Sequence, residues 1–265
     1  MSKTSSARIC QIVGFIICVA PVAVQSRAYG QACGEQFCQF NQGDYVVQND
    51  KWGMNADPNG SQKIWPDGDG WYATVNWAFT NRSVKSYPSI VAGWNFGANW
   101  TPKRDGFPVL VSSNPSLPTS TTWETTGTFN HYDVAYDLFL SPDNNPQKPS
   151  AEVMVWIGQA GQRPAGDQVA TAVRIDGVPG TWDVWVGDVG WKVYSFVRTS
   201  SVNSFSGNLQ PFIHYLAYTH DYLSKDWYVL DMQFGAEILE ANGKFINKSF
   251  YGRANGGLPL AVSTP

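Results

Sequence analysis

The run Ala151–Gly158 (AEVMVWIG) is apolar apart from Glu152, which lies at its head. An isolated ionised carboxylate in an apolar interior would cost several kcal/mol, so this glutamate must lie at a strand end or on a face that is not core. Successive side chains of a strand point to opposite faces, and the two valines and the isoleucine of the run therefore share one apolar face. Glu152, Met154 and Trp156 share the other. An acid, a thioether and an indole along one face describe the floor of a groove better than a core.

Two further runs divide in the same way into an apolar and an acidic face. They are residues 131–140 (HYDVAYDLFL) and 226–238 (DWYVLDMQFGAEI). The acids at their alternating positions are Asp133, Asp137, Asp231 and Glu237. A solvent-facing strand face would usually mix lysine, threonine and serine with its acids, and these faces have none. We therefore expect the three strands to form one concave, acidic and aromatic-lined surface.

Paired carboxylates across a groove are the catalytic groups of glycoside hydrolysis. One attacks the anomeric carbon or positions water, and the other, with a raised pKa, protonates the departing oxygen. The twelve tryptophans, twelve tyrosines and fourteen phenylalanines fit sugar binding, because flat rings stack on sugar faces, but aromatic residues also fill large β cores. On the residue pattern alone, acids on an ordinary solvent face remain the alternative.

About eleven short apolar runs provide the elements that would position these side chains. They are residues 43–50, 71–79, 89–97, 107–113, 131–140, 151–158, 169–175, 181–187, 190–198, 226–238 and 243–250. Clusters of Gly, Pro, Asn, Asp and Ser separate them. This spacing predicts an all-β fold, a two-sheet β-jelly-roll sandwich with one concave substrate groove.

Residues 208–226 break the strand pattern. Their apolar side chains recur with i, i+3, i+4 spacing, Asn208 can cap a helix, and Pro211 fits a first turn. We predict a single amphipathic helix packed outside a sheet. No linker or internal repeat divides the rest of the chain, so residues 33–265 are expected to form one domain.

Residues 1–32 have the features of a signal peptide. Lys3 and Arg8 precede an apolar stretch of about 16 residues, shorter than the roughly 20 that span a bilayer. We expect cleavage between residues 26 and 33 and export of the remaining chain, with no membrane segment. A membrane anchor is the weaker alternative.

The exported chain would be acidic. Removing Lys3, Arg8 and Arg27 leaves 15 basic residues against 21 acidic ones, a net charge of −6, which argues against nucleic acid and anionic membranes as partners. The histidines and the remaining cysteines lack ligand spacing, so we expect no metal and no cofactor. Cys33 and Cys38 are expected to form a local disulfide, with a free pair as the alternative.

The sequence resembles glycoside hydrolase family 12, the small endo-β-1,4-glucanases and xyloglucanases with a β-jelly roll. The matching segments run from about residue 44 to 250 and include GDYVVQNDKWG, VKSYPSIVAGW, DVAYDLFL, AEVMVWIG, PAGD, KVYSFV and MQFGAEI. The most specific is acid-x-Met-x-Trp at Glu152, followed by Phe-Gly-x-Glu at Glu237. VKSYPSIVAGW and PAGD are most similar to the bacterial branch.

The resemblance implies a retaining mechanism and a role for each matching residue. Glu152 corresponds to the nucleophile, Glu237 to the acid/base, and Asp137 to the aspartate that tunes the protonation of the nucleophile. The implied sugar-binding residues are Trp52, Trp156, Met154 and Asp50. The family often has Asn at the position of Asp50, so this chain departs from the family pattern at one expected sugar contact.

We therefore predict a secreted, monomeric, retaining endo-β-1,4-glucanase that acts on plant cell-wall β-glucan. Three alternatives remain: a xyloglucan-specific endoglucanase of the same family, a non-catalytic carbohydrate-binding jelly roll, and a secreted protein recognised by a plant host, whose activity is incidental. The presence of both catalytic-type acids argues against the binding module.

Overall fold

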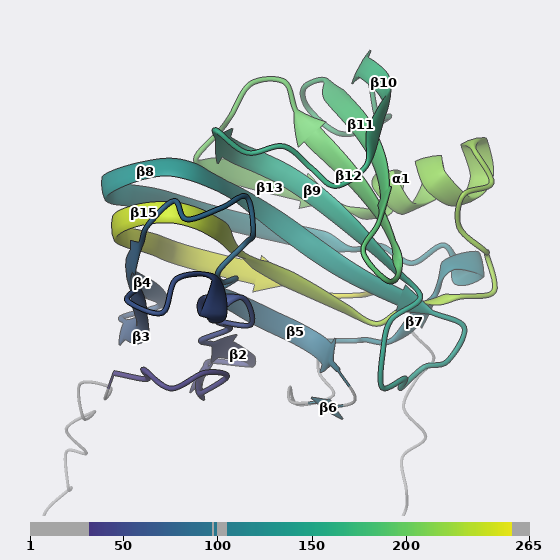
Figure 1. The fold of residues 1–265 in the computed structure, drawn as a ribbon. Coiled ribbons are helices and arrows are strands. Elements are labelled where there is room, and N and C mark those ends of the chain that lie inside the picture. Colours follow the sequence, from purple (N-terminus) through teal and green to yellow (C-terminus); the bar gives the residue numbers. More distant parts are fainter. Residues whose placement is uncertain (1–31, 97, 100–104, 256–265) are drawn as a thin grey trace, which may run out of the picture.

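The computed structural model describes residues 32–96, 98–99 and 105–255, so the predicted signal peptide lies outside the described part apart from Ala32. The described chain is mostly β-strand, which confirms the predicted all-β class (Figure 1). Cys33 and Cys38 form the expected disulfide. Within the described ranges no helix is both long and apolar enough to cross a bilayer.

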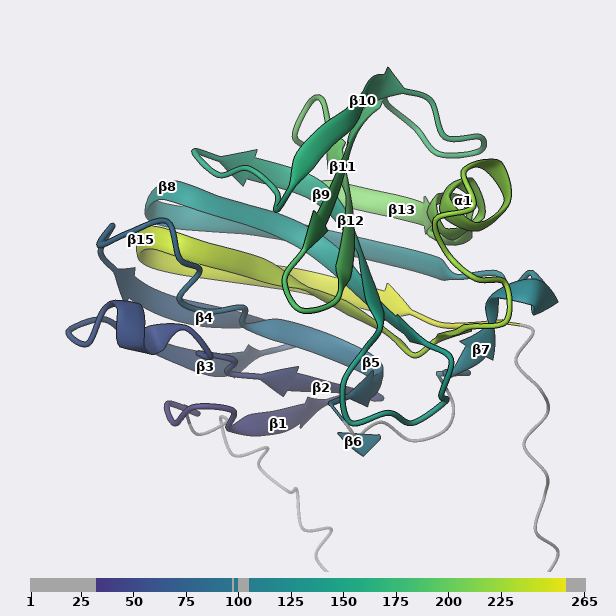
Figure 2. The ribbon, with the colours of Figure 1, turned by 45° about the vertical axis from the view of Figure 1, so that its right-hand side comes forward.

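Nine strands form the inner sheet, which carries the acidic faces. In spatial order they are β1 (Gln39–Gln42), β2 (Tyr45–Gln48), β5 (Ser89–Asn95), β15 (Asp231–Gly252), β8 (Pro118–Ser141), β9 (Ala151–Ala160), β12 (Lys192–Arg198), β11 (Trp182–Asp188) and β10 (Asp167–Val173). Figure 2 shows the two ends of this order, with β1 near the bottom and β10 at the top. Neighbouring strands are antiparallel except β9 and β12, which are parallel.

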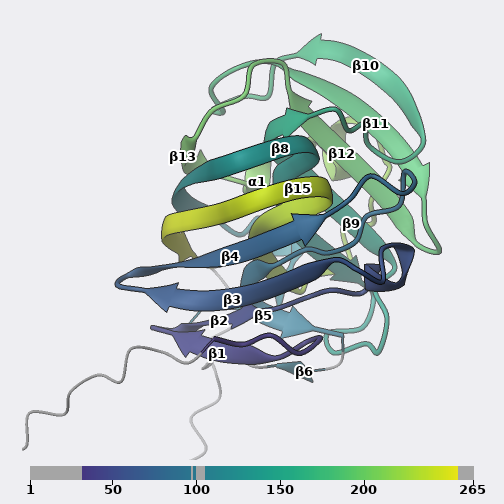
Figure 3. The same cartoon turned by 60° about the vertical axis from the view of Figure 1, so that its left-hand side comes forward.

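The outer sheet is built largely from the other halves of the same two long strands. The second half of β15 pairs with β4 (Gly70–Trp77), which pairs with β3 (Ser61–Asp67), and the first half of β8 pairs with β13 (Ser204–Asn208). Figure 3 shows β8 and β15 curling from one layer into the other. Three short strands, β6 (Ala98–Asn99), β7 (Val109–Leu110) and β14 (Tyr228–Val229), add to the edges.

The curl of β8 and β15 has a local cause. Their register shifts twice between Ile238 and Ala241, and such bulges bend a strand and increase its twist. Nearby, Gly127 (φ +85°) lies opposite Gly243, and a Cβ on Gly127 would come within 2.4 Å of the Asn242 carbonyl oxygen. Only glycine allows the two strands to approach this closely there.

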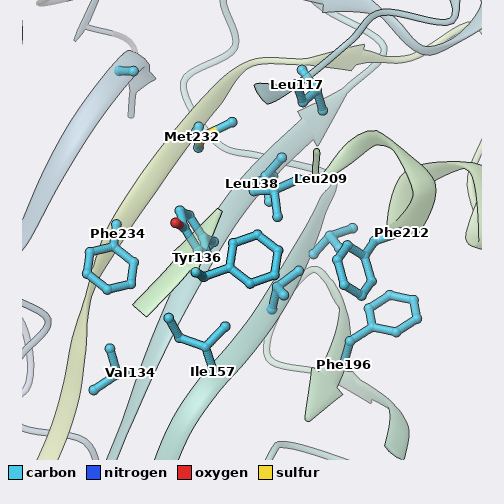
Figure 4. Packing of buried hydrophobic residues seen from close by; sticks show 14 of the residues in the cluster. Leu117, Val134, Tyr136, Leu138, Ile157, Phe196, Leu209, Phe212, Met232 and Phe234 are labelled. Carbon is cyan, nitrogen blue, oxygen red and sulfur yellow. The ribbon is translucent and has the colours of Figure 1, made fainter. Parts of the chain in front are cut away.

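The core lies between the layers and uses the predicted apolar faces of β8, β9 and β15. Its members include Val134, Tyr136, Leu138, Val153, Val155, Ile157, Met232 and Phe234 (Figure 4). The strand parity expected from the sequence is therefore correct for all three strands, and their other face is free to carry the acids.

The predicted helix is present but shorter than expected. It comprises α1 (Gln210–His214) and a π-helical turn, η3 (Tyr215–Thr219), and it packs on the apolar side of the inner sheet, where the ring centroid of Phe212 lies 4.9 Å from those of Trp182 and Phe196. The Asn208 side chain accepts a hydrogen bond from the Gln210 N–H at its start. Residues 220–226 of the predicted segment are not helical.

The sequence patterns missed several strands. β1, β3, β13 and the first half of β8 lie outside the predicted runs, because their residues are mainly Ser, Thr, Asn, Gln, Lys and Pro. In β8 the hydroxyl of the buried Thr121 donates a hydrogen bond to the Ser249 carbonyl. Its polar group is therefore satisfied, so a hydroxyl residue can occupy a buried position in a strand. Residues 107–113 contain the two-residue strand β7 (Val109–Leu110) followed by a 3₁₀ turn, η2 (Val111–Ser113), rather than one continuous strand.

Candidate active site

Three neighbouring strands place the predicted catalytic residues on one face of the inner sheet. Glu152 of β9 lies opposite Phe139 of β8, and Glu237 of β15 lies opposite Asp133 of β8. Asp137 lies between these two positions on β8, opposite Met154 on one side. The sheet therefore brings Glu152, Asp137 and Glu237 together as the strand parity predicts.

Two rows of cross-strand partners separate Glu152 from Glu237. One row is Met154, Asp137 and Gln233, and the other is Trp156, Ala135, Gly235 and Ser89. The two rows run across the strands. A linear polymer bound along these rows would therefore have Glu152 at one edge and Glu237 at the other. The second row contains small residues, and a Cβ on Gly235 would come within 2.4 Å of the Pro88 carbonyl oxygen. Glycine at 235 is thus required by close packing.

Glu152 is almost buried, with 8% of its surface exposed. The indole N–H of Trp191 donates a hydrogen bond to its Oε2 over 2.8 Å. Burial raises the pKa of Glu152 to about 8, the Trp191 hydrogen bond opposes that rise, and the charge of Glu237 adds to it. The two glutamates therefore affect each other's ionisation, as expected for inward-pointing side chains on a concave face.

Glu237 is partly exposed and has two hydrogen-bonding partners. The Gln162 amide donates to Glu237 Oε2 over 3.2 Å, and Asp133 is hydrogen-bonded to the same glutamate. Burial raises the pKa of Glu237, and both hydrogen bonds oppose that rise. A carboxyl group with a raised pKa keeps its proton to a higher pH than an exposed carboxyl group does, and it can give that proton to a substrate.

Asp137 is the third acid of this face and is buried. Burial raises its pKa well above the usual range, the charges of Glu152 and Glu237 raise it further, and a hydrogen bond with Tyr87 opposes the rise. The ion pairs formed by the described residues all lie elsewhere, at Glu240, Asp188, Glu124 and Asp44. Protons, rather than lysine or arginine side chains, must therefore limit the charge on this face.

Asp50 and Trp52 lie in the loop after β2, on the side of Glu237. Trp52 is 53% exposed, and its backbone N–H donates to Asp50 Oδ1 over 2.9 Å. Burial raises the pKa of Asp50 to about 7, and the charge of Glu237 contributes to the rise. Trp52 thus offers an open indole next to an acid that is electrostatically linked to the candidate acid/base.

Trp156 differs from the expectation of an open stacking surface. It is 1% exposed and packs with Met154, Ala135, Val193 and Val197. In this structure its indole supports the floor from within and has no free face for a sugar ring. The physical reason is the neighbouring strand β12, where Val197 lies directly opposite Trp156, together with Trp185 and Trp191, which pack against the same cluster.

Three features of the site were not evident from the sequence. Trp191 lies in the β11–β12 turn and Gln162 follows β9, and neither has a spacing that links it to an acid. Glu240 is three residues from Glu237 and would face the other way in a regular strand, but the bulge at Leu239 places it opposite His131. The distance between Glu240 Oε2 and His131 Nδ1 is 2.6 Å. Bulges commonly redirect a side chain in this way.

We expect the thermal stability of the protein to fall between pH 5 and pH 8. Burial raises the pKa of Glu152 to about 8 and that of Asp50 to about 7, so these groups bind protons more tightly in the folded state than in the unfolded chain. Their stabilising contribution is complete below an unfolded pKa of about 4 and is lost as the pH rises through the folded value, at up to about 1.4 kcal/mol per pH unit and group. The exposed Asp188 and the partly exposed Glu240 have pKa values lowered by their hydrogen bonds, so they change the stability only below about pH 4.

Differential scanning calorimetry across this pH range tests the expectation. For a domain of this size each kcal/mol corresponds to about 2–4 °C in Tm. The E152Q variant should show a shallower decline, because one of the titrating groups is gone. A Tm that is constant or rises from pH 5 to pH 8 would contradict the assignment of protons to this face.

No group of three or more His, Cys, Asp or Glu side chains in the described ranges is arranged to hold a metal ion. A jelly-roll sheet with paired acids on its inner face, each beside a neutral N–H donor, is the arrangement of a polysaccharide-cleaving glycoside hydrolase.

Comparison with known proteins identifies the family. The model of glycosyl hydrolase family 12 matches residues 43–253. Endoglucanase S of Pectobacterium parmentieri is 34% identical over 219 residues, which cover 77% of this chain and 80% of that protein. The native family 12 xyloglucanase from Bacillus licheniformis superposes with a TM-score of 0.79 at 28% identity, covering 85% of this chain and all of that one (100%). Endoglucanase 3 of Trichoderma harzianum superposes with a TM-score of 0.76 at 30% identity, covering 87% of this chain and 100% of that one. The chain belongs to glycosyl hydrolase family 12, which confirms the resemblance seen in the sequence.

Proposed function

We propose that this protein is a secreted, retaining endo-β-1,4-glucanase that cleaves internal bonds of plant cell-wall glucan without a metal or cofactor. The observation that carries the proposal is the placement of Glu152 and Glu237 on one sheet face, separated by two rows of residues. Each has a neutral donor, Trp191 or Gln162, that can hold its carboxylate in place.

In the first half of the reaction Glu237 is protonated, which removes the charge that adds to the raised pKa of Glu152. The ionised form of Glu152 then attacks the anomeric carbon and forms a glycosyl ester. Glu237 gives its proton to the departing glycosidic oxygen at the same time. The Trp191 N–H holds Glu152 in position and stabilises its charged form. Asp137 in the neighbouring row interacts with Glu152 electrostatically, so the protonation of one acid influences that of the other.

In the second half, Glu237 takes a proton from water, and the resulting hydroxide attacks the anomeric carbon. The bond between sugar and Glu152 breaks, so the carboxylate is restored and the product keeps its anomeric configuration. Glu237 therefore needs a protonated form in one half-reaction and an ionised form in the other, which a pKa raised by burial and restrained by two hydrogen bonds allows.

Reducing-end assays on carboxymethyl-cellulose, mixed-linkage glucan and xyloglucan test the substrate, and proton NMR of the first product tests retention. The relatives are named as endoglucanases and as a xyloglucanase, so the order of rates on the three polymers separates the main proposal from the xyloglucan-specific alternative. Initial formation of the α-anomer would contradict retention. If no polymer releases reducing ends, the hydrolase proposal is wrong and the non-catalytic carbohydrate-binding jelly roll becomes the favoured alternative.

Replacing Trp52 by alanine should weaken the binding of cello-oligosaccharides by about 1–3 kcal/mol, the contribution of a large ring face removed from water. Its 53% exposure and its position beside Asp50 support a stacking role. Isothermal titration in an E152Q background, where the ligand is not cleaved, measures the change. Tyr251→Ala removes another exposed ring (42%), from the outer-sheet half of β15, and should leave the affinity unchanged. Equal affinities for the Trp52 variant and its parent would return Trp52 to a structural role.

Export and monomeric behaviour are part of the proposal. The charged and apolar pattern of residues 1–32 supports a cleaved signal, and the net charge of −6 beyond it favours solubility. N-terminal sequencing of protein from a culture supernatant should give a start between residues 27 and 33, and light scattering should give the mass of one chain.

A further inference from the structure

Asp133 is a fully buried acid (0% exposed) that the reaction described above does not use. It lies directly opposite Glu237 across the β8–β15 ladder, and the two side chains are hydrogen-bonded. Two carboxyl groups can share a hydrogen bond only if one of them carries a proton.

Gln162 fixes the geometry of this pair. Its amide nitrogen donates to Asp133 Oδ2 over 2.8 Å and to Glu237 Oε2 over 3.2 Å. The other oxygen, Asp133 Oδ1, is buried and receives no hydrogen bond from an N–H or O–H group of the described residues. An ionised carboxylate with one such oxygen would pay a large desolvation cost, whereas a carboxylic acid would not.

Among the described residues, the groups around the pair supply no compensating cation. The titratable groups that face the pair are Asp137 on β8, Glu152 on β9, Asp50 in the loop after β2, and Tyr87 before β5. One step further along β8, His131 is already engaged by Glu240. Of the two hydrogen-bonded acids, Asp133 is the more deeply buried, so the proton is better placed on Asp133 than on Glu237 when only one proton is present.

We propose that Asp133 is a positioning residue that stays protonated throughout the catalytic cycle and donates its hydrogen bond to Glu237. The proposal rests on the acid/base role of Glu237. It assigns to Asp133 the hydrogen bond that stabilises the ionised form of Glu237. When Glu237 has given its proton to the leaving oxygen, the Asp133 O–H stabilises the new carboxylate. When Glu237 takes a proton from water, that hydrogen bond is weakened, and the Asp133 proton does not leave.

The pH profile of kcat/KM on a β-glucan tests this, because its alkaline limb reports the loss of the Glu237 proton in the free enzyme. In Asp133→Ala the donor is gone, so the limb should move to higher pH by about 1–2 units, the loss expected for a hydrogen bond to a charged group. Asp133→Asn keeps an N–H donor and should hold the limb close to its wild-type position. If Asp133 is instead ionised, both variants remove a negative neighbour and the limb moves to lower pH, which overturns the proposal.

Asp231→Asn is the matched control. Asp231 is also a fully buried acid of this face, but it lies at the other end of the β15 segment and is held by the Gln233 amide and the Phe139 N–H. Its replacement should leave the alkaline limb in place. A shift equal to that of Asp133→Ala would show that any buried acid has this effect, and would overturn the specific role of Asp133.

An infrared difference spectrum between wild type and Asp133→Asn at neutral pH gives a readout that does not depend on activity. We expect the carbonyl stretch of a protonated carboxylic acid in the wild type and its loss in the variant. Absence of that band overturns the proposal even if the enzyme is active. Its presence in a protein that hydrolyses no glucan would support the protonated Asp133 and contradict only the proposed enzyme function.

Discussion

Replacing Glu152 by glutamine should lower turnover on β-glucan by about 10³-fold or more and leave binding in place. Glutamine has the size of glutamate and can still accept the hydrogen bond that Trp191 donates over 2.8 Å. It lacks the charge that attacks the anomeric carbon, so the covalent step is lost. The barrier should rise by several kcal/mol, and each 1.36 kcal/mol corresponds to about a tenfold change in rate.

Release of reducing ends measures the first effect, and titration with a cello-oligosaccharide measures the second. Glu124→Gln is a suitable control because Glu124 lies in the outer-sheet half of β8 and pairs at the surface with Lys248. An exposed pair of this kind contributes about 0–1 kcal/mol, so that variant should be active and stable. Full activity of Glu152→Gln would remove Glu152 from the mechanism.

The part of this site that the sequence predicts is the part that strand parity controls. Glu152, Asp137 and Glu237 are each followed or preceded by apolar residues at alternating positions, and the packed core uses those residues as expected. The family motifs then connect β8 and β9 with β15, which several other elements separate from them in the chain. Strand parity and family motifs both depend on residues that are close together in the chain, and the sequence alone shows these residues.

The features that depend on register and turn geometry could not be predicted. Trp191 reaches Glu152 because β12 runs parallel beside β9, a pairing between strands with two others between them in the chain. Glu240 faces His131 because a bulge at Leu239 changes the parity of β15. The burial of Trp156 follows from the same β12 neighbour. Each of these needs the position of a second strand, and no single run of residues specifies it.

The electrostatics of the inner face follow from that packing. Asp133, Asp137 and Asp231 are all buried, and burial is the largest cause of the raised pKa of each. A sequence shows that acids alternate along a strand but not that the surrounding strands supply no cation. The difference matters chemically, because a face that holds protons can deliver one to a leaving group.

Replacing Glu237 by glutamine should give a different defect from the Glu152 variant, and this difference tests the retaining mechanism. Glutamine can still accept the Gln162 hydrogen bond at this position, but it neither donates a proton to the leaving oxygen nor activates water. Turnover on polymeric β-glucan should fall by about 10²–10⁴-fold, the usual contribution of general acid–base catalysis. An aryl cellobioside with a good leaving group needs no proton in the first step, so Glu152 should still be glycosylated.

The variant should then stall as a covalent intermediate, which gives the sharpest readout of the mechanism. Mass spectrometry should show the protein plus one cellobiosyl group, located on the peptide that contains Glu152. Added azide needs no general base, so it should restore turnover and give a β-cellobiosyl azide, the product of two inversions at the same carbon. Glu152→Gln should show neither the adduct nor the rescue, because it has no nucleophile. An α-configured azide from the Glu237 variant would exclude the covalent intermediate on Glu152. Rescue of the Glu152 variant in place of the Glu237 variant would mean that the two assigned roles are exchanged.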